Sequence, residues 1–204
     1  RRTSTAPAAV AVTDTAGVTR GYAQNITVQG WSGTTYYISD TGNDANAGTS
    51  EAAPWRTVTK AAQNAGPNRR FLFRRGATFN VSTFVGVNGA GPGLFGAYGS
   101  GAKPVLNFSG ADSQIMVYTD DWRFMDLEFN GPASGPMGLT LGSSGGIDRF
   151  LAYRLKIRGF GVGLGWSNIS NAPPNEGCVV AECDVASAHT NGMYLGGRRL
   201  AVIG

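Results

Sequence analysis

Short apolar segments recur along the second half of the chain, separated by small or polar residues. One family has the form Gly-apolar-x-Leu-Gly and occupies residues 138–142, 161–165 and 192–196. A second family alternates apolar and charged residues at 125–129, 153–157 and 181–185, at a constant spacing of 28 residues. Two strands per repeat, each unable to bury its own apolar side, indicate a coiled parallel sheet whose core forms when the repeats stack.

The alternation within the second family predicts which side chains face the core. Successive residues of a strand point to opposite faces, and stacked repeats place equivalent residues in columns. The predicted inward columns are Leu127, Leu155 and Cys183, and Phe129, Ile157 and Val185. The outward columns are two charged ladders, Asp126, Arg154 and Glu182, and Glu128, Lys156 and Asp184.

The first third of the chain has a different texture. Residues 1–33 read as an N-terminal arm or linker with a short strand at 26–28. Apolar residues at helical spacing predict a helix over 54–65, with Pro54 in its first turn and Gly66 just past its end. The remainder, 34–204, is predicted to be one β-helix domain with a cap at 34–66 and rungs from about 70 onward.

Composition agrees with a folded, turn-rich β protein. The 204 residues include 31 Gly and 9 Pro, and only 15% are charged. No apolar run is long enough to predict a membrane span. The net charge of +4 contains one dense basic cluster, Arg69, Arg70, Arg74 and Arg75. Solvated arginines on an edge strand or contact with an anionic polymer would each explain this cluster, and no nucleic-acid partner is expected.

Cysteine and histidine usage excludes a zinc site, because His189 is the only histidine and no metal-ligand spacing is present. Cys178 and Cys183 would lie about 16 Å apart on a straight strand, too far for a disulfide, although a bend would permit one. Asn-x-Ser/Thr triplets offer glycosylation only in a eukaryotic secretory pathway. These triplets begin at Asn25, Asn80, Asn107 and Asn168.

Three stretches in the first half carry a family resemblance. They are Tyr36-Tyr37-Ile38-Ser39-x-x-Gly42-Asn43-Asp44-x-Asn46-x-Gly48-Thr49, Pro54-Trp55-x-Thr57-Val58, and Phe71-Leu72-Phe73-Arg74-Arg75-Gly76-Ala77-Thr78-Phe79. Together they resemble the opening of secreted right-handed parallel β-helix proteins of the pectate-lyase-like superfamily. Residues 96–106 are similar to the first rungs of bacterial members.

The resemblance implies an all-β, right-handed parallel β-helix with a short N-terminal capping helix. It also implies a secreted or cell-surface protein whose partner is a polysaccharide. Members include lyases, hydrolases, epimerases, phage tailspikes and adhesins, so the chemistry has to be argued from a site. The last rung ends in mid-strand, and an unpaired edge invites association, so this rung is expected to be paired either with further chain or with a partner. Self-association is therefore expected through that open end or through the N-terminal arm.

Lyase chemistry on a uronic-acid polymer is the favoured activity. Proton abstraction beside a carboxylate needs a base, which in similar β-helix lyases is Lys or Arg, and positive charge such as Ca²⁺ to stabilise the intermediate. Lys156 is the candidate base, with Arg154 and Arg158 disfavouring its protonated form. Two neighbouring carboxylates oppose this role unless Ca²⁺ neutralises them. The predicted calcium ligands are Glu128, Asp184 and Asp126.

Two alternatives remain open. Hydrolases of this fold converge carboxylates on one bond, and the only acidic doublet is Asp120-Asp121, which Asp148 could approach. The other alternative is a non-catalytic structural or adhesive β-helix, such as a fibre, appendage or tailspike segment, in which the charge ladders only fix the register. For the carbohydrate-active function, sugar contacts are expected at Trp166, Tyr194 and His189.

Overall fold

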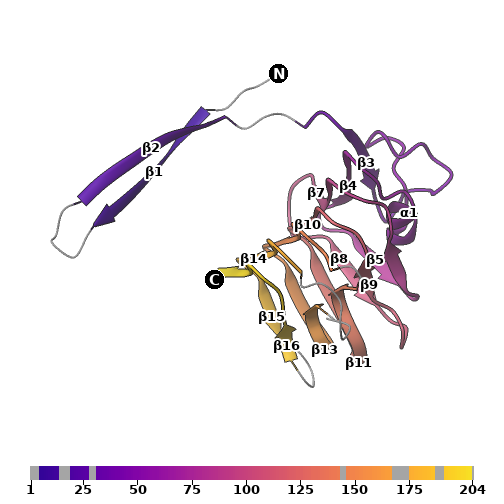
Figure 1. Cartoon of the computed structure of the whole chain (residues 1–204). Coiled ribbons are helices and arrows are strands. Elements are labelled where there is room, and N and C mark those ends of the chain that lie inside the picture. The colour runs from indigo at the N-terminus through magenta and orange to yellow at the C-terminus, as the bar shows by residue number, and fades with distance from the viewer. Residues whose placement is uncertain are drawn as a thin grey trace. The chain divides into compact units, whose positions relative to one another are not determined.

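The computed structural model describes residues 5–13, 19–27, 31–142, 146–166, 175–186 and 191–203. The chain divides into two units, Arg1–Ser32 and Gly33–Gly204. In the first, β1 (Thr5–Thr13) and β2 (Thr19–Thr27) form an antiparallel hairpin (Figure 1). The sequence predicted only a short strand at 26–28 here, because Ala-rich segments carry a weak strand signal.

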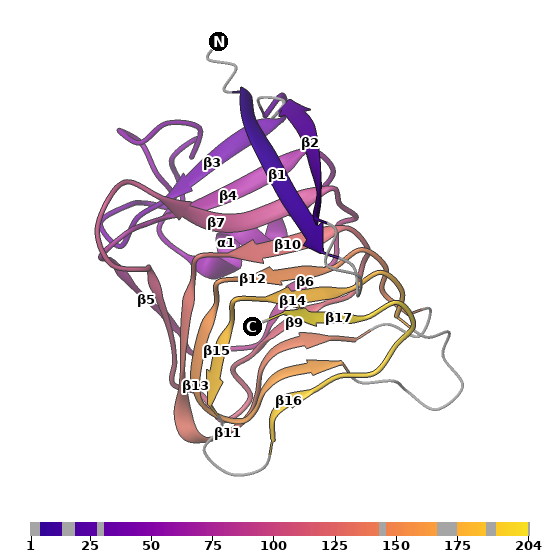
Figure 2. The ribbon, with the colours of Figure 1, turned by 90° about the vertical axis from the view of Figure 1, so that its left-hand side faces the viewer.

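The second unit is a parallel β-helix, and all of its strand pairs are parallel. Figure 2 shows its strands coiling around a common interior. The predicted fold class, a right-handed parallel β-helix with a short N-terminal helix, is confirmed. One sheet has seven strands, β3 (Thr34–Ile38), β4 (Arg69–Arg74), β7 (Gly93–Tyr98), β10 (Trp122–Met125), β12 (Leu151–Tyr153), β14 (Val179–Ala181) and β17 (Ala201–Ile203).

The other sheet has eight strands. Five stack in order, β5 (Thr78–Val81), β8 (Val105–Phe108), β11 (Glu128–Leu141), β13 (Lys156–Trp166) and β15 (Asp184–Ala186). Three further strands extend it, β6 (Val85–Val87), β9 (Ile115–Val117) and β16 (Asn191–Tyr194). The two sheets alternate along the chain, so each rung contributes to both.

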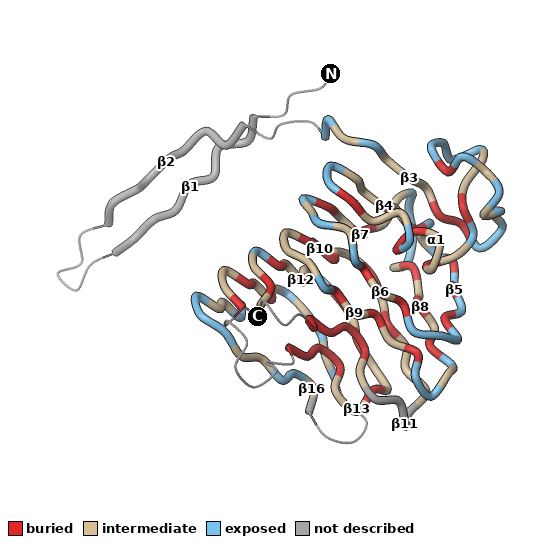
Figure 3. The backbone as a smooth tube through the Cα atoms, turned by 45° about the vertical axis from the view of Figure 1, so that its right-hand side comes forward, coloured by how far each residue is buried: buried red, intermediate tan, exposed pale blue. Residues whose placement is uncertain are grey.

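The hydrophobic core lies inside the rungs, and Figure 3 marks the buried residues of each rung in red. Aromatic residues stack between neighbouring rungs, with Phe95 and Phe124 at 4.8 Å between ring centroids. The predicted columns are confirmed, since Phe129 pairs with Ile157 and Ile157 with Val185. Leu127 and Leu155 are fully buried and Cys183 partly so.

The second repeat family does not form straight strands, however. The chain turns a corner between the two sheets at Asp126, Arg154 and Glu182, where φ is 58°, 50° and 50°. This left-handed conformation is uncommon for residues other than glycine. Cys178 comes directly before β14 (Val179–Ala181), and Cys183 comes directly after the corner at Glu182. Both are free thiols.

The cap is a shorter helix than the sequence predicted. α1 (Val58–Gln63) begins after Thr57, whose hydroxyl accepts the Lys60 N–H at 3.1 Å. Its buried residues Val58, Ala61 and Ala62 pack against the first strands β3, β5 and β6. Residues 54–56 are not helical, because Trp55 pairs instead with the end of β3 and stacks on Tyr36 at 4.4 Å.

At the other end of the unit, β17 is the last strand of the seven-stranded sheet. Val202 and Ile203 on it are exposed. Pairing of this rung with further chain or with a partner stays a prediction. Among the described residues, no helix has the length and apolar character that a membrane span requires.

Candidate functional site

The outward ladder on the eight-stranded sheet exists as predicted. Parallel pairing places Glu128, Lys156 and Asp184 in register on β11, β13 and β15. Lys156 Nζ donates to Glu128 Oε1 at 3.0 Å. The guanidinium of Arg158 pairs with the Asp184 carboxylate, and it also donates to the Asp184 carbonyl at 2.8 Å. Each acidic residue of the ladder therefore has a cationic partner.

Arg154 belongs to the corner ladder and is occupied there. Its guanidinium lies 2.6 Å from Asp126 Oδ2, and Arg75 approaches the same oxygen at 3.3 Å. The hydrogen bond and the charge of Asp126 raise the pKa of Arg154. The positive charge of Arg154 is therefore compensated by this carboxylate and is not directed at Lys156.

The structure does not bring the predicted calcium ligands together. Glu128 faces Lys156, Asp126 sits between two arginines, and Asp184 is bound to Arg158. Across the described ranges, no group of three His, Cys, Asp or Glu residues is arranged to hold a metal ion. Calcium binding by these three carboxylates has no support from this geometry and stays a prediction.

The predicted sugar contacts divide three ways. Trp166 is fully buried and packs edge-on against Phe150 at 5.5 Å, so its proposed role as a sugar platform is wrong. The error arose because β13 continues through Trp166, and strand alternation turns the ring inward with Leu164. Tyr194 on β16 is 59% exposed and remains accessible. His189 lies outside the described residues.

The acidic doublet serves the backbone. Asp148 does approach Asp120, as predicted, by donating its N–H to Asp120 Oδ1 at 2.9 Å. One rung later, Asp148 Oδ1 accepts the N–H of Glu176 at 3.1 Å. Asp121 pairs with Arg123 at 2.7 Å. The contacts of Asp120 and Asp148 tie successive rungs together, so these carboxylates have a structural role in the described part of the chain.

An amide ladder that was not predicted lies beside the charged one. Asn80, Asn107 and Asn130 are in register on β5, β8 and β11. Asn107 Nδ2 donates to Asn80 Oδ1 at 3.1 Å. The sequence signal for this ladder was an asparagine at the equivalent outward position of three successive rungs. We call the outward residues of both ladders the polar face, namely Asn80, Asn107, Asn130, Glu128, Lys156, Arg158 and Asp184.

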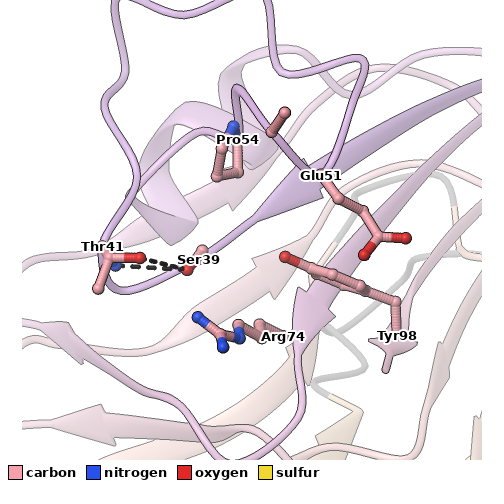
Figure 4. A pocket seen from close by; sticks show the side chains of 7 residues that line it. Ser39, Thr41, Glu51, Pro54, Arg74 and Tyr98 are labelled. Atoms are coloured by element: carbon pink, nitrogen blue, oxygen red, sulfur yellow. Dashed lines mark hydrogen bonds between the residues drawn. The ribbon is translucent and has the colours of Figure 1, made fainter. Parts of the chain in front are cut away.

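A second polar feature lies beside the loop between β3 and α1. A hollow of about 360 Å³ is lined there by Ser39, Thr41, Glu51, Arg74 and Tyr98, together with Ala52 and Pro54 (Figure 4). Arg74 and Tyr98 are paired residues at the ends of β4 and β7. We call this the cap hollow. No repeat or motif predicted it, since its members come from separate elements.

The loop beside the cap hollow is held in place by residues of the motif at 36–49 and 54–58. Asp44 accepts the N–H groups of Arg56 and Thr57 at 2.8 and 3.0 Å, and the Thr57 hydroxyl at 2.6 Å. Burial acts to raise the pKa of Asp44, but these hydrogen bonds outweigh it and the pKa is lowered. At Gly42, any Cβ would lie 2.2 Å from the Trp55 carbonyl oxygen. The motif is therefore structural.

Comparisons with known proteins give one sequence relative and a set of similar folds. No family model matches the chain. It is 42% identical over 90 residues to a lacto-N-biosidase of Bifidobacterium longum subsp. longum, a match that covers 39% of this chain and 6% of that protein. Native and selenomethionine structures of a GH136 lacto-N-biosidase from Eubacterium ramulus superpose with TM-scores of 0.60 and 0.59 at 21% identity.

These superpositions cover 73% of this chain and 33% of the solved chains. At that identity they show a shared fold alone. A rhamnogalacturonan lyase matches with a TM-score of 0.41 at 14% identity, which is too weak a likeness to carry an argument. The chain thus spans a third or less of the length of the lacto-N-biosidases that it matches.

Proposed function

We propose that this chain is part of a carbohydrate-active β-helix protein and that its polar face contacts a glycan. The observation that carries the proposal is the 42% identity to a lacto-N-biosidase, by its name a glycan-acting enzyme. The parallel β-helix fold shared with solved lacto-N-biosidases is consistent with this assignment. Secretion to the cell exterior follows from the proposal, because an extended glycan substrate is met there.

The chemistry of the polar face suits an extended, hydroxyl-rich ligand. Stacked rungs repeat about every 4.8 Å, so each rung offers the ligand a fresh set of donors and acceptors. Asn80 and Asn107 supply amides that both donate and accept. Glu128 and Lys156 supply one acceptor group and one donor group on adjacent strands. A polymer lying across the strands would exchange hydrogen bonds with several rungs at once.

β-Elimination from an anionic polysaccharide is the second candidate function. Lys156 and Arg158 are both on the polar face, where an anionic substrate would meet them. The Lys156 side chain is held, however, in a 3.0 Å ion pair with Glu128, a contact that base catalysis would have to break. The geometry therefore supports glycan recognition by this face more directly than base catalysis.

Calorimetric titration of the whole chain with a glycan panel tests the proposal. The panel comprises lacto-N-biose oligosaccharides, polygalacturonate and alginate, each with and without Ca²⁺. We expect saturable binding to at least one of them. Asn107→Ala should weaken it about tenfold, the scale of a lost hydrogen bond plus an unsatisfied partner. The matched control is Asn88→Ala, an exposed asparagine outside the polar face.

Two outcomes would change the assignment. Absence of binding across the panel would contradict the carbohydrate-active proposal. Ultraviolet absorbance from unsaturated uronate products, present in the wild type and lost in Lys156→Ala, would establish β-elimination. Binding without any product from the panel would instead favour the non-catalytic alternative.

A further inference from the structure

Four arginines cluster around β4, and only Arg74 of these four lacks a hydrogen-bond or ion-pair partner among the described residues. Within the described part of the chain, the Arg74 side chain makes no hydrogen bond or ion pair. Arg69 donates to the Asn64 carbonyl at 2.8 Å and Arg70 to Thr35 Oγ1 at 2.7 Å. Arg75 pairs with Asp126 Oδ2 at 3.3 Å. Arg74 lines the cap hollow. Its guanidinium therefore has donors available to a ligand there.

Two further polar groups of the cap hollow are equally unoccupied. Neither the Glu51 carboxylate nor the Tyr98 hydroxyl has a hydrogen-bond partner among the described residues. In the view of Figure 4 the Tyr98 ring lies between Glu51 and Arg74, and Arg74 reaches toward Ser39 and Thr41. Burial, followed by the charge of Glu51, raises the pKa of Tyr98. The phenol therefore keeps its proton and can donate at neutral pH.

The walls of the cap hollow are fixed before any ligand arrives. The buried Ser39 hydroxyl bonds the Thr41 hydroxyl at 3.0 Å, and the Tyr98 ring packs edge-on against Tyr37 at 5.1 Å. The loop is closed further on by the Asp44 hydrogen bonds. Preorganised groups lose little freedom on binding, which favours affinity.

Charge decides which ligands suit this arrangement. The hollow has one guanidinium and one carboxylate, so attraction of a charged ligand to one group is offset by repulsion from the other, and the ligand's own charge must still be desolvated. An adjoining hollow of about 250 Å³ shares Arg74 and adds Asp40 and Arg75, of which Arg75 is already paired. Carboxylate, guanidinium and phenol together offer both acceptors and donors to hydroxyl groups. A volume of 360 Å³ lies in the range of small-molecule sites.

We propose that the cap hollow is a binding site for an uncharged sugar unit, held by hydrogen bonds to Arg74, Glu51 and Tyr98. This inference rests on the proposed carbohydrate-active function. It adds a second binding site, apart from the polar face, and specifies an uncharged sugar as the ligand of that site. In the site, Glu51 accepts hydrogen bonds from sugar hydroxyls, and Arg74 and Tyr98 donate to sugar oxygens. The exposed part of the Tyr98 ring offers an apolar surface to the sugar ring.

Residue-resolved NMR titration of the whole chain tests the site. Lactose is the uncharged probe, and galacturonic acid and glucosamine are the anionic and cationic ones. We expect lactose to shift the amide signals of Thr41 and Ala52 saturably. Both charged probes should bind at least about tenfold more weakly, because each meets one opposite and one like charge and has no net Coulomb gain to offset the desolvation of its own charge.

Variants then separate this proposal from the preceding one. Arg74→Ala and Glu51→Gln should each weaken lactose binding about tenfold, the scale of a lost hydrogen bond to a charged group. Tyr98→Phe keeps the ring and removes only the donor. Arg198→Ala is the matched control, an exposed arginine on a late rung. Glu51 is exposed, so Glu51→Gln should keep the fold even if Arg74→Ala does not.

Specific results would overturn the site. Tighter binding of galacturonic acid than of lactose would do so, as would lactose shifts that survive both Arg74→Ala and Glu51→Gln. Lactose shifts confined to the polar face and abolished by Asn107→Ala would overturn the cap hollow while leaving the proposed function intact. Failure of every sugar to bind anywhere on the chain would overturn both.

Discussion

Replacing Asp44 by alanine should destabilise the cap of the β-helix by about 2 kcal/mol. One carboxylate there accepts two backbone N–H groups at 2.8 and 3.0 Å and a hydroxyl at 2.6 Å. A hydrogen bond to a charged group contributes about 1.5–3 kcal/mol. Asp44 is only partly buried, so water can replace some of these contacts. We therefore expect a net loss of stability of about 2 kcal/mol, the same size as the largest losses seen when a helix N-cap is removed.

Urea unfolding followed by circular dichroism measures this loss, with Asp40→Ala as the control. Asp40 is exposed and receives only the Ser39 hydroxyl, at 3.3 Å, so its removal should cost less than about 0.5 kcal/mol. The pKa of folded Asp44 is lowered from 3.8. Its stabilisation is therefore complete above that value and is lost as the pH falls through the folded-state pKa. Equal losses in the two variants, or an Asp44→Ala deficit that does not shrink as the pH is lowered from 3.8, would refute the reasoning.

Two further predictions concern packing. Gly42→Ala should lower the melting temperature by about 4–8 °C, since overpacking against the Trp55 carbonyl costs about 2 kcal/mol. Gly196→Ala is the control and should have almost no effect, because no atom lies within 4 Å of a Cβ placed there. Equal shifts of the two variants in scanning fluorimetry would contradict this. Burial raises the pKa of the Cys178 and Cys183 thiols, so a disulfide reagent should label them slowly in the native chain and rapidly in urea. Immediate labelling of both thiols without urea would show that these rungs are open.

The fold was predictable because stacking makes the repeat spacing visible in the sequence. The 28-residue separation of Glu128 and Lys156 fixes which residues lie opposite one another, so the columns of Phe129, Ile157 and Val185 follow directly. The corner at Asp126 was not predictable in the same way. Its left-handed backbone depends on local geometry, and the apolar alternation passes through it unchanged.

The site was predictable only as far as register determines contacts. Register placed Lys156 opposite Glu128, and the ion pair is there. It does not say how far a long side chain reaches, so the pairing of Arg75 with Asp126 from a distant rung was missed. The cap hollow is harder still, because Glu51, Arg74 and Tyr98 come from a loop and two strands and share no sequence spacing.

The corners that join the two sheets make the β-helix modular. Asp126, Arg154 and Glu182 adopt nearly the same left-handed backbone, so each rung leaves its corner in the direction from which the next rung must start. A whole rung can then be duplicated or deleted without changing the cross-section that its neighbours meet. Length can evolve or be engineered in steps of one rung. A difference of a few residues within a rung is absorbed locally, since β11 and β13 pair 28 residues apart at Asn130 and Arg158 but 25 apart at Gly135 and Phe160.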